Sequence, residues 1–231
     1  DEGVHTAEVL RRRGDPGVRR VGVVRLEPCR MDVAADRFAD TSATHIHTAR
    51  FDADDPDTAD AWVTSAAEHF GRVDALVNNA GLLKMVSFDK GTEAELDDMW
   101  QVNVKAPFRL IRAALPHLKA TGQGRVVNVA STDGKRYRDA TTSLGYVMTK
   151  HALVAMTHAC RFAGWDDGLR ATAICPGAID TEMIAGIPGV TPVAERLQPT
   201  TVADIVAFIL SLPNQASVPE FIANTRLEST L

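Results

Sequence analysis

Short apolar runs, separated by longer amphipathic segments, constrain the fold of this chain most strongly. Five runs, at 20–24, 45–51, 75–78, 125–129 and 171–175, are rich in Val, Ile, Leu or Ala without clean alternation of polar and apolar residues, and a weaker sixth lies at 221–224. Such strands are typical of parallel sheets covered by helices on both faces. The pattern predicts one α/β domain over residues 1–231, with a Rossmann-like, doubly wound parallel sheet.

The amphipathic segments between these runs predict the helices. They lie at 7–13, 31–39, 58–70, 93–119, 143–163 and 201–212. The longest carries apolar residues at spacings of three and four, which places them on one helical face. The segment 176–198 is punctuated by Gly and Pro, and this favours a mobile loop or short helices.

Composition excludes several classes of protein. The net charge is −5 and the only basic cluster, at 11–13 and 19–20, is short, so we expect no nucleic-acid partner. No apolar run approaches the length of a membrane span. The three cysteines are widely spaced, so we expect reduced thiols, no metal site and a cytoplasmic location. Because the chain begins at Asp1 and not at Met, we also expect residues ahead of it.

A tyrosine and a lysine four residues apart form the most informative motif. Tyr146 and Lys150 lie on one face of the predicted helix 143–163. An isolated tyrosine has a pKa near 10, too high for efficient acid/base work at neutral pH, and a close ammonium lowers it. The pair therefore indicates proton transfer. Taken alone, it also fits an ordinary exposed helix.

A proline interrupts the longest predicted helix. Pro107 has no N–H, so the carbonyl of Asn103, four residues earlier, loses its usual helical partner and needs another donor. The residues indicate either a deliberate break at a site or a plain kinked helix.

Three further motifs follow predicted strands, at the sheet edge where parallel α/β proteins bind ligands. Ser131 follows one strand, with Thr132 as a rival for the same role. The run Asn78-Asn79-Ala80-Gly81 ends another, and 175–181 (CPGAIDT) follows a third. Each motif can equally form an ordinary turn, so none of them indicates a site by itself.

Taken in series, these motifs resemble the short-chain dehydrogenase/reductase family. The resemblance covers about 51–181, and any single motif is weak while six in order are specific. The matching positions are Asp52, Asn78-Asn79-Ala80-Gly81, Asn103, Ser131, Tyr146 with Lys150, and Pro176-Gly177 with Thr181.

The family resemblance implies a carbonyl–alcohol oxidoreductase with four catalytic residues. Tyr146 is implied as the general acid/base, and Ser131 as the group that orients and polarises the carbonyl. Lys150 would lower the pKa of Tyr146 and bind the nicotinamide ribose. Asn103 would hold a water in a proton relay to Lys150 through its backbone carbonyl.

The resemblance also implies a nicotinamide cofactor and the residues around it. These are Gly3, Arg25, Asp52, Asn79, Ala80, Gly81, Tyr146, Lys150, Pro176, Gly177, Ile179 and Thr181. Arg25 lies after the strand whose end normally selects between the two cofactors, and an arginine there suits a 2′-phosphate. We therefore expect NADP in preference to NAD.

One departure from the family pattern lies at the start of the chain. The family's first strand and Gly-rich turn are missing, and only Gly3 stands near the expected place, with His5 where a glycine is usual. The first strand lies beside the fourth in that family, so its loss would leave a gap in the sheet. The alternative to an enzyme is therefore a non-catalytic binding or scaffold protein that keeps the fold without cofactor affinity.

The substrate and the assembly follow from the resemblance in outline only. We expect a small carbonyl or alcohol whose pocket is formed by 82–85, 133–138 and 183–191, with Met183 and Ile184 as an apolar wall. Gly186 and Gly189 would let the last of these loops close over the ligand. The helices at 93–119 and 143–163 resemble those that pair between subunits, so a homodimer or homotetramer is expected.

Overall fold

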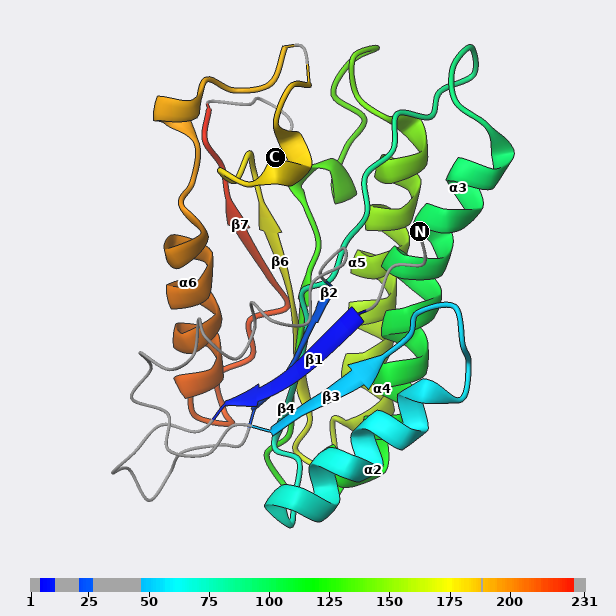
Figure 1. Ribbon diagram of the computed structural model, residues 1–231. Helices are drawn as coiled ribbons and strands as arrows, with labels where there is room; N and C mark the ends of the chain where they lie inside the picture. The colour runs from blue at the N-terminus through cyan, green and yellow to red at the C-terminus, as the bar shows by residue number, and fades with distance from the viewer. Residues whose placement is uncertain (1–4, 11–20, 27–46, 188, 227–231) are drawn as a thin grey trace.

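The computed structural model describes residues 5–10, 21–26, 47–187 and 189–226 (Figure 1). Its seven strands are β1 His5–Leu10, β2 Val21–Leu26, β3 His47–Phe51, β4 Ala75–Asn78, β5 Arg125–Val129, β6 Arg170–Pro176 and β7 Glu220–Ala223. Its α-helices are α2 Thr58–Phe70, α3 Glu93–Trp100, α4 Ala106–Ala120, α5 Leu144–Gly164 and α6 Pro199–Ser211. A π turn, Gln101–Lys105, joins α3 to α4, and short 3-10 turns lie at Thr132–Gly134, Glu182–Ile184 and Val193–Glu195.

The strands form one sheet in the order β3-β1-β2-β4-β5-β6-β7. From β2 to β7 every neighbouring pair is parallel, as the apolar runs predicted. Strand β1 is the exception, because it runs antiparallel to both β2 and β3.

The prediction of a helix at 7–13 is wrong, since His5–Leu10 is a strand. Ala, Glu, Leu and Arg favour helices locally, but the backbone here pairs with β2 on one side and with β3 on the other. Pairing along both edges outweighs a weak local propensity. The helix predicted at 31–39 lies outside the described residues.

Strand β2 lies where a gap was expected. It pairs in parallel with β4, so the strand that fills the place beside β4 comes from Val21–Leu26. The backbone of Arg25 lies in this strand and is opposite Thr6 of β1. Arg25 therefore stands on the strand beside β4, one strand closer to the centre of the sheet than its proposed role assumes.

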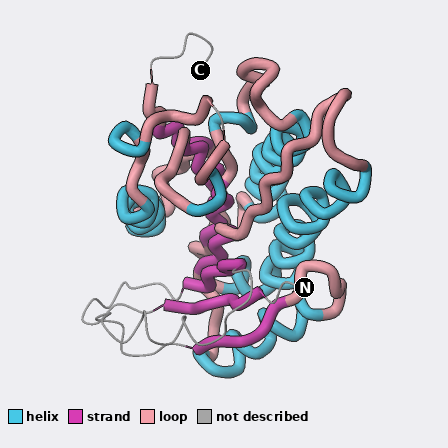
Figure 2. Tube along the Cα trace, turned by 45° about the horizontal axis from the view of Figure 1, so that its top comes forward, coloured by secondary structure: helices cyan, strands magenta, loops and turns pink. Residues whose placement is uncertain are grey.

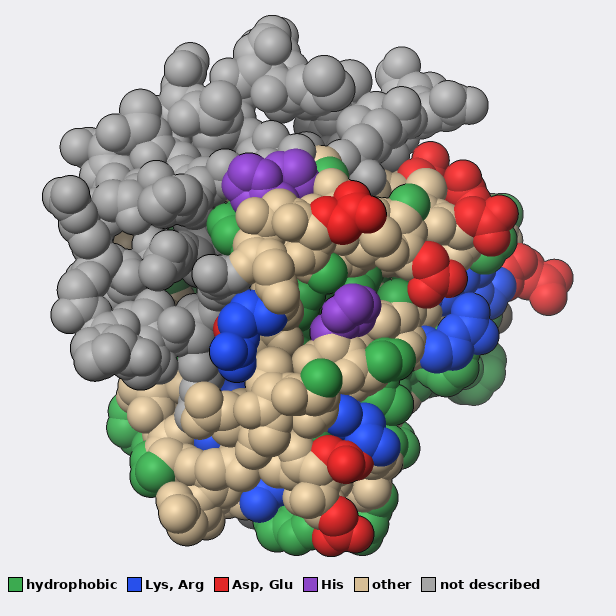
Figure 3. Space-filling model, turned by 90° about the horizontal axis from the view of Figure 1, so that it is seen from below, with side chains coloured by type: hydrophobic (Ala, Val, Ile, Leu, Met, Phe, Trp, Pro, Cys, Tyr) green, Lys and Arg blue, Asp and Glu red, His purple; other side chains and the backbone are tan. Residues whose placement is uncertain are grey.

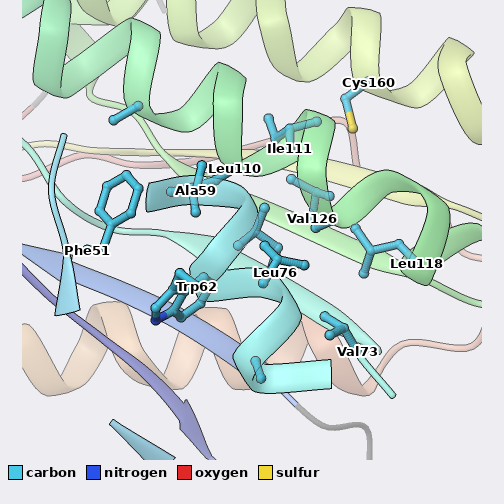
Figure 4. Close-up of a cluster of buried hydrophobic side chains, with 14 of the residues drawn as sticks. Phe51, Ala59, Trp62, Val73, Leu76, Leu110, Ile111, Leu118, Val126 and Cys160 are labelled. Atoms are coloured by element: carbon cyan, nitrogen blue, oxygen red, sulfur yellow. The ribbon is translucent and has the colours of Figure 1, made fainter. Parts of the chain in front are cut away.

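The parallel strands bury both faces. On one face, Leu76 and Val126 pack in a cluster with Leu110 of α4 and Trp62 of α2, as the close-up in Figure 4 shows. On the other face, the alternate residues Val77, Val127 and Ile174 pack with Ile209 of α6. All are at most 4% exposed, and burying each such side chain stabilises the fold by roughly 1.5–3 kcal/mol.

The loops after the parallel strands gather at one end of the sheet. Figure 2 shows these loops beyond the C-terminal ends of β4 to β7, at the end where α3 and α5 begin. Most of the residues predicted to act in chemistry lie on these loops or on the two helices. The fold therefore brings together positions that are up to a hundred residues apart in the chain.

Candidate active site

The predicted break in the long helix is real. The helix 93–119 divides into α3 and α4 at the π turn, where the N–H of Ala106 bonds to the carbonyl of Gln101. Pro107 follows at the start of α4 and cannot donate to the carbonyl of Asn103. A π turn of this kind inserts one extra residue and commonly marks a functional position.

Asn103 is fully buried at this turn, and both the oxygen and the nitrogen of its side-chain amide make hydrogen bonds. Its Oδ1 accepts from the N–H of Leu82 at 2.7 Å, and its Nδ2 donates to the carbonyl of Leu82 at 2.8 Å. The same Nδ2 also donates to Oγ1 of Thr149 at 3.0 Å. One side chain thus ties the loop after β4 to the π turn and to α5.

Tyr146 and Lys150 lie on the buried face of α5, on one side as their spacing predicted. The Nζ of Lys150 lies 5.5 Å from the centroid of the Tyr146 ring and donates to the carbonyl of Val129 at 2.9 Å. Lys150 as a whole is 3% exposed. Among the described residues no carboxylate is in salt-bridge contact with it.

The electrostatics of this pair differ from the expectation. Burial raises the pKa of Tyr146 above its ordinary value, the charge of Asp133 raises it further, and a hydrogen bond with Ser131 acts in the opposite direction. Burial lowers the pKa of Lys150 to about 8. The predicted lowering of the Tyr146 pKa by Lys150 is therefore not found, because desolvation dominates at this depth.

Ser131 is placed beside Tyr146 by the turn that follows β5. It is buried and is the first residue of that turn, where its Oγ accepts from the N–H of Asp133 at 3.0 Å. A Cβ on Gly134 would lie 2.8 Å from the carbonyl oxygen of Lys150, so the turn packs directly on α5. The predicted rival, Thr132, is also buried and lies one residue farther along.

The start of α5 is fixed against the loop after β4. Ser143 caps the helix, because its Oγ accepts from the N–H of Tyr146, and the same Oγ donates to the carbonyl of Lys84 at 2.7 Å. A Cβ on Gly145 would lie 2.5 Å from Cε of Met99, so the start of α5 packs closely on α3. These contacts hold Tyr146 at a fixed place in the site.

The loop after β4 lies against Lys150 and Asn103 at Gly81. A Cβ on Gly81 would lie 3.4 Å from Nζ of Lys150, 3.6 Å from Cε of Met183 and 3.7 Å from Oδ1 of Asn103. Ala80 is buried and Asn79 is exposed. The small residue at 81 thus lets this loop approach the lysine closely, and we call this place the cradle at Gly81; its role toward the nicotinamide end of a cofactor stays a prediction.

The loop after β6 lies against the end of β7. The N–H of Gly177 donates to Ala223 at 2.8 Å, and a Cβ on Gly177 would lie 3.1 Å from Oγ1 of Thr225, so only glycine fits without a shift. Farther along, Ile179 pairs with Leu197. Pro176 is buried, and Thr181 is exposed at the end of the sheet.

Three predicted cofactor residues are not brought into this arrangement by any described contact. Gly3 lies outside the described residues, and the side chain of Arg25 is not described. Asp52 lies just after β3, half-buried, and its Oδ1 accepts from the N–H of Asp54 at 2.9 Å. Their roles toward a cofactor stay predictions.

Two residues of the site escaped the sequence analysis. Thr149 donates to the carbonyl of Tyr146 and accepts from Asn103, and its place beside Lys150 on the same helix was the available signal. Asp133 was named only as part of a pocket wall, yet its charge acts on Tyr146. That effect depends on how the turn after β5 packs, which spacing in the sequence does not predict.

Metal sites and membrane spans can be assessed only for the part of the chain that the structure describes. Within it, no group of three or more His, Cys, Asp and Glu side chains could hold a metal ion. No helix in the same part is both long and apolar enough to cross a bilayer. Cys160 and Cys175 are buried and unpaired, and Cys29 lies outside the described residues.

Comparison with known proteins agrees with this geometry. The family model described as short chain dehydrogenase matches residues 5–188. An agropine synthesis reductase from Rhizobium rhizogenes is 41% identical over 197 residues. The match covers 82% of this chain but only 45% of that reductase, so the chain spans less than half of the relative's length.

Solved structures share the fold. An alcohol dehydrogenase from the archaeon Thermococcus sibiricus, complexed with 5-hydroxy-NADP, is similar with a TM-score of 0.69 and 30% identity, over 77% of this chain and 75% of that one. A 3-ketoacyl-(acyl-carrier-protein) reductase from Brucella melitensis, complexed with NADH, gives a TM-score of 0.68 and 27% identity, over 75% of each chain.

Proposed function

The chain belongs to the short chain dehydrogenase family, and on that premise we propose that it is an NAD(P)-dependent oxidoreductase that interconverts a carbonyl and an alcohol. The observation that carries the proposal is that Lys150 and Asn103 lie at the cradle at Gly81, with Tyr146 beside Lys150 and Ser131 hydrogen-bonded to the tyrosine. These residues come from four separate segments of the chain. A bare scaffold has no need of a buried lysine, and within the described part of the chain this lysine has no carboxylate partner.

The chain's own residues account for the proton in this reaction. A bound nicotinamide would supply the hydride to the carbonyl carbon. The phenol of Tyr146 gives its proton to the carbonyl oxygen as the C=O bond becomes C–O–H, and the hydroxyl of Ser131 donates a hydrogen bond to the same oxygen. Lys150 lies beside the tyrosine, with its Nζ 5.5 Å from the ring centroid, where the family resemblance implies that it binds the nicotinamide ribose.

The raised pKa of Tyr146 favours reduction near neutral pH. With its pKa above the ordinary value, the phenol stays protonated and ready to donate, whereas alcohol oxidation requires the phenolate as a base. We therefore expect the reduction rate to be flat around neutral pH and the oxidation rate to rise as the pH increases. A pH profile measured in both directions tests this assignment.

Cofactor preference, assembly and location belong to the same proposal. We propose NADP in preference to NAD because the similar structure with the higher identity, 30%, carries an NADP derivative, while the one with 27% identity carries NADH. Exposed Phe108 on α4 and Phe162 on α5, 52% and 85% exposed, support a homodimer or homotetramer through these helices. The two unpaired thiols, Cys160 and Cys175, support a reducing compartment such as the cytoplasm.

Isotope transfer tests the proposed reaction directly. The protein is incubated with a panel of aldehydes and ketones and with NADPH or NADH deuterated at the transferred position, and the products are analysed by mass spectrometry. We expect deuterium on the carbinol carbon of an alcohol product. Conversion without deuterium in the product would show a different chemistry on this fold, and no conversion with any carbonyl would favour the scaffold.

A further inference from the structure

A carboxylate on β7 joins the turn after β5 to α5. Oε2 of Glu220, the first residue of β7, lies 2.7 Å from Nζ of Lys135, and Oε1 lies 2.7 Å from Nε2 of His158. Lys135 directly follows the turn that begins at Ser131, and His158 lies on α5. One side chain thus contacts both segments that supply the catalytic groups.

Hydrogen bonds to β6 hold the start of β7. The N–H of Ala173 donates to the carbonyl of Pro219 at 3.0 Å, and Oγ1 of Thr172 donates to the carbonyl of Val218 at 2.6 Å. In the parallel register Glu220 lies opposite Ala173, which packs in a buried cluster with residues of α5. Glu220 therefore extends from a fixed strand on the face of the sheet that α5 covers.

Lys135 closes the turn that carries Ser131. The N–H of Gly134 donates to the carbonyl of Ser131 at 2.9 Å, and the N–H of Lys135 donates to the carbonyl of Thr132 at 3.0 Å. Two successive residues hold this turn in place, because Gly134 packs on α5 and the side chain of Lys135 reaches Glu220. A shift of Lys135 would therefore move the backbone that positions the serine.

The carboxylate of Glu220 is charged and shared. Burial alone would raise its pKa, but hydrogen bonds from Lys135 and His158 outweigh burial and lower it. Because a carboxylate only accepts, Nε2 of His158 is the donor. The side chains of Glu220 and Lys135 are 22% and 28% exposed, and partly exposed ion pairs contribute little to the free energy of unfolding. The arrangement therefore serves to place the turn more than to stabilise the whole fold.

The ion pair also lies close to the buried end of β6. Burial raises the pKa of Cys175 to about 11, Glu220 raises it further, and Lys135 and Lys150 act in the opposite direction. The ion pair and the catalytic lysine thus act on the same buried thiol. This places Glu220 and Lys135 beneath the site and not at a remote part of the surface.

We propose that Glu220 is a positioning residue, which sets the place of the Ser131 hydroxyl in the site by holding Lys135 and His158 at the same time. The inference rests on the proposed carbonyl–alcohol activity. A hydrogen bond to the reacting oxygen depends steeply on the position of its donor. Because Glu220 acts through the turn, its loss should lower kcat and leave the affinity for the cofactor unchanged.

Matched variants test the inference with the aldehyde or ketone of the isotope-transfer panel that gives the highest kcat/KM. Glu220→Gln removes the charge and Lys135→Met removes its partner. Each should lower kcat by about 10-fold, a part of the roughly 10²–10³-fold loss when such a donor is removed outright, with KM for the cofactor unchanged. Lys135→Arg should keep kcat close to that of the wild-type protein, because it keeps the charge and the donors.

Asp167→Asn is the matched control. Asp167 lies 2.7 Å from Nζ of Lys119, beyond the C-terminal end of α5, so the pair has the same length and the same loss of charge. Its removal should leave kcat and both KM values unchanged.

A double-mutant cycle and hydrogen exchange separate positioning from general weakening. If Glu220 acts through Ser131, Glu220→Gln should not lower kcat further in a Ser131→Ala background. Hydrogen exchange read by mass spectrometry does not depend on turnover. The amides of Asp133, Gly134 and Lys135 form the hydrogen bonds of the turn and should exchange faster in Glu220→Gln. Exchange in β4 and the melting temperature should stay unchanged.

The outcomes separate this inference from the proposed function. Unchanged kcat in Glu220→Gln, or an equal loss in the wild-type and Ser131→Ala backgrounds, would overturn the positioning role and leave the oxidoreductase standing. Faster exchange over the whole protein with a lower melting temperature would also overturn it, because the ion pair would then stabilise the fold.

Absence of turnover by the wild-type protein with every carbonyl would overturn the proposed function. Hydrogen exchange then decides whether Glu220 holds the turn. Faster exchange confined to 133–135 in Glu220→Gln would support that placement, and unchanged exchange there would overturn it.

Discussion

The two ends of the parallel strands bury positive charge in different ways. Where β5 begins, Arg125 is 2% exposed and donates to Oδ1 of Asn214 at 2.7 Å and to the carbonyl of Leu212 at 3.0 Å. Beyond the other end, Lys150 is equally buried, and its one hydrogen bond among the described contacts is to the carbonyl of Val129. The first charge joins β5 to the loop after α6, whereas the second faces the cradle at Gly81.

This difference distinguishes a buried charge that stabilises the fold from one that is available for chemistry. A buried charge that several groups satisfy stabilises a local arrangement, whereas one held by a single neutral acceptor has a shifted pKa and is available to a ligand. The surface at the end of the sheet where β5 begins carries charges of both signs. Figure 3 views that end of the molecule, where basic and acidic side chains lie interspersed and no single charge dominates the described part.

The largest expected effect is on the side of the sheet where Tyr146 and Lys150 lie, beyond the C-terminal ends of the parallel strands. Tyr146→Phe removes the proton donor and keeps the ring, so kcat should fall by about 10²–10⁴-fold, the usual contribution of a general acid. Thermal stability and cofactor affinity should stay close to those of the wild-type protein. Steady-state kinetics and a melting curve measure both. Turnover retained within a factor of ten would mean that another group supplies the proton.

The next effect concerns the charge of Lys150. The pKa of Lys150 is about 8 in the folded protein and 10.5 ordinarily. Below pH 8 the lysine is therefore charged in both the folded and the unfolded state, and the cost of desolvating its charge lowers the stability of the folded state. As the pH rises from 8 to 10.5 the folded state releases this proton first, and stability increases by up to about 3 kcal/mol. Lys150→Met should lack this increase.

Denaturation of the wild-type protein and the variant on both sides of that pH range measures the difference. Lys119→Met is the control, because Lys119 pairs with Asp167 and is partly exposed, and the variant should keep the wild-type pH profile. Parallel profiles for the wild-type protein and Lys150→Met would show that the buried lysine keeps an ordinary pKa.

At the other end of the parallel strands, where Arg125 lies, we expect a loss of stability without a loss of activity. Arg125→Met keeps much of the side-chain volume and leaves the partners at Asn214 and Leu212 without their donor, so the free energy of unfolding should fall by about 2 kcal/mol. Because Arg125 lies at the start of β5, at the end of the strand away from Ser131, kcat/KM should stay unchanged. Urea denaturation and kinetics on the same preparation check both parts. A selective loss of activity would contradict the division between the two ends.

The smallest effect concerns the capping box of α3. Oγ1 of Thr92 accepts from the N–H of Glu95, and the Glu95 carboxylate accepts from the N–H of Thr92 at 2.8 Å. Thr92→Ala should cost about 1 kcal/mol of stability. Since α3 leads into the π turn, a change in activity beyond a factor of two would show that the helix start also positions Asn103.

Local spacing explains what the sequence could predict. Tyr146 and Lys150 share a face because four residues make about one helical turn, and the break at Asn103 follows from the missing N–H of Pro107. The residues after β4, β5 and β6 meet because the C-terminal ends of parallel strands share one edge. Each of these inferences needs only short-range geometry or one topological rule.

Long-range pairing and desolvation explain what the sequence could not predict. Strand β1 is a strand because β2 and β3 flank it, and its own residues favour a helix. The pKa of Tyr146 depends on how deeply the ring is buried and on Asp133, which the packing of a loop on α5 brings near. Neither effect is visible in the spacing of residues.

The most direct test of the account is a titration of the purified protein with NADPH and with NADH, followed by the fluorescence of the reduced nicotinamide. The account predicts saturable binding, tighter for NADPH, and weakened in Gly81→Leu, whose side chain would fill the cradle beside Lys150. Tighter binding of NADH would overturn the preference for NADP alone. Absence of binding for both cofactors would contradict the central claim and would mean that the buried tyrosine and lysine belong to a scaffold.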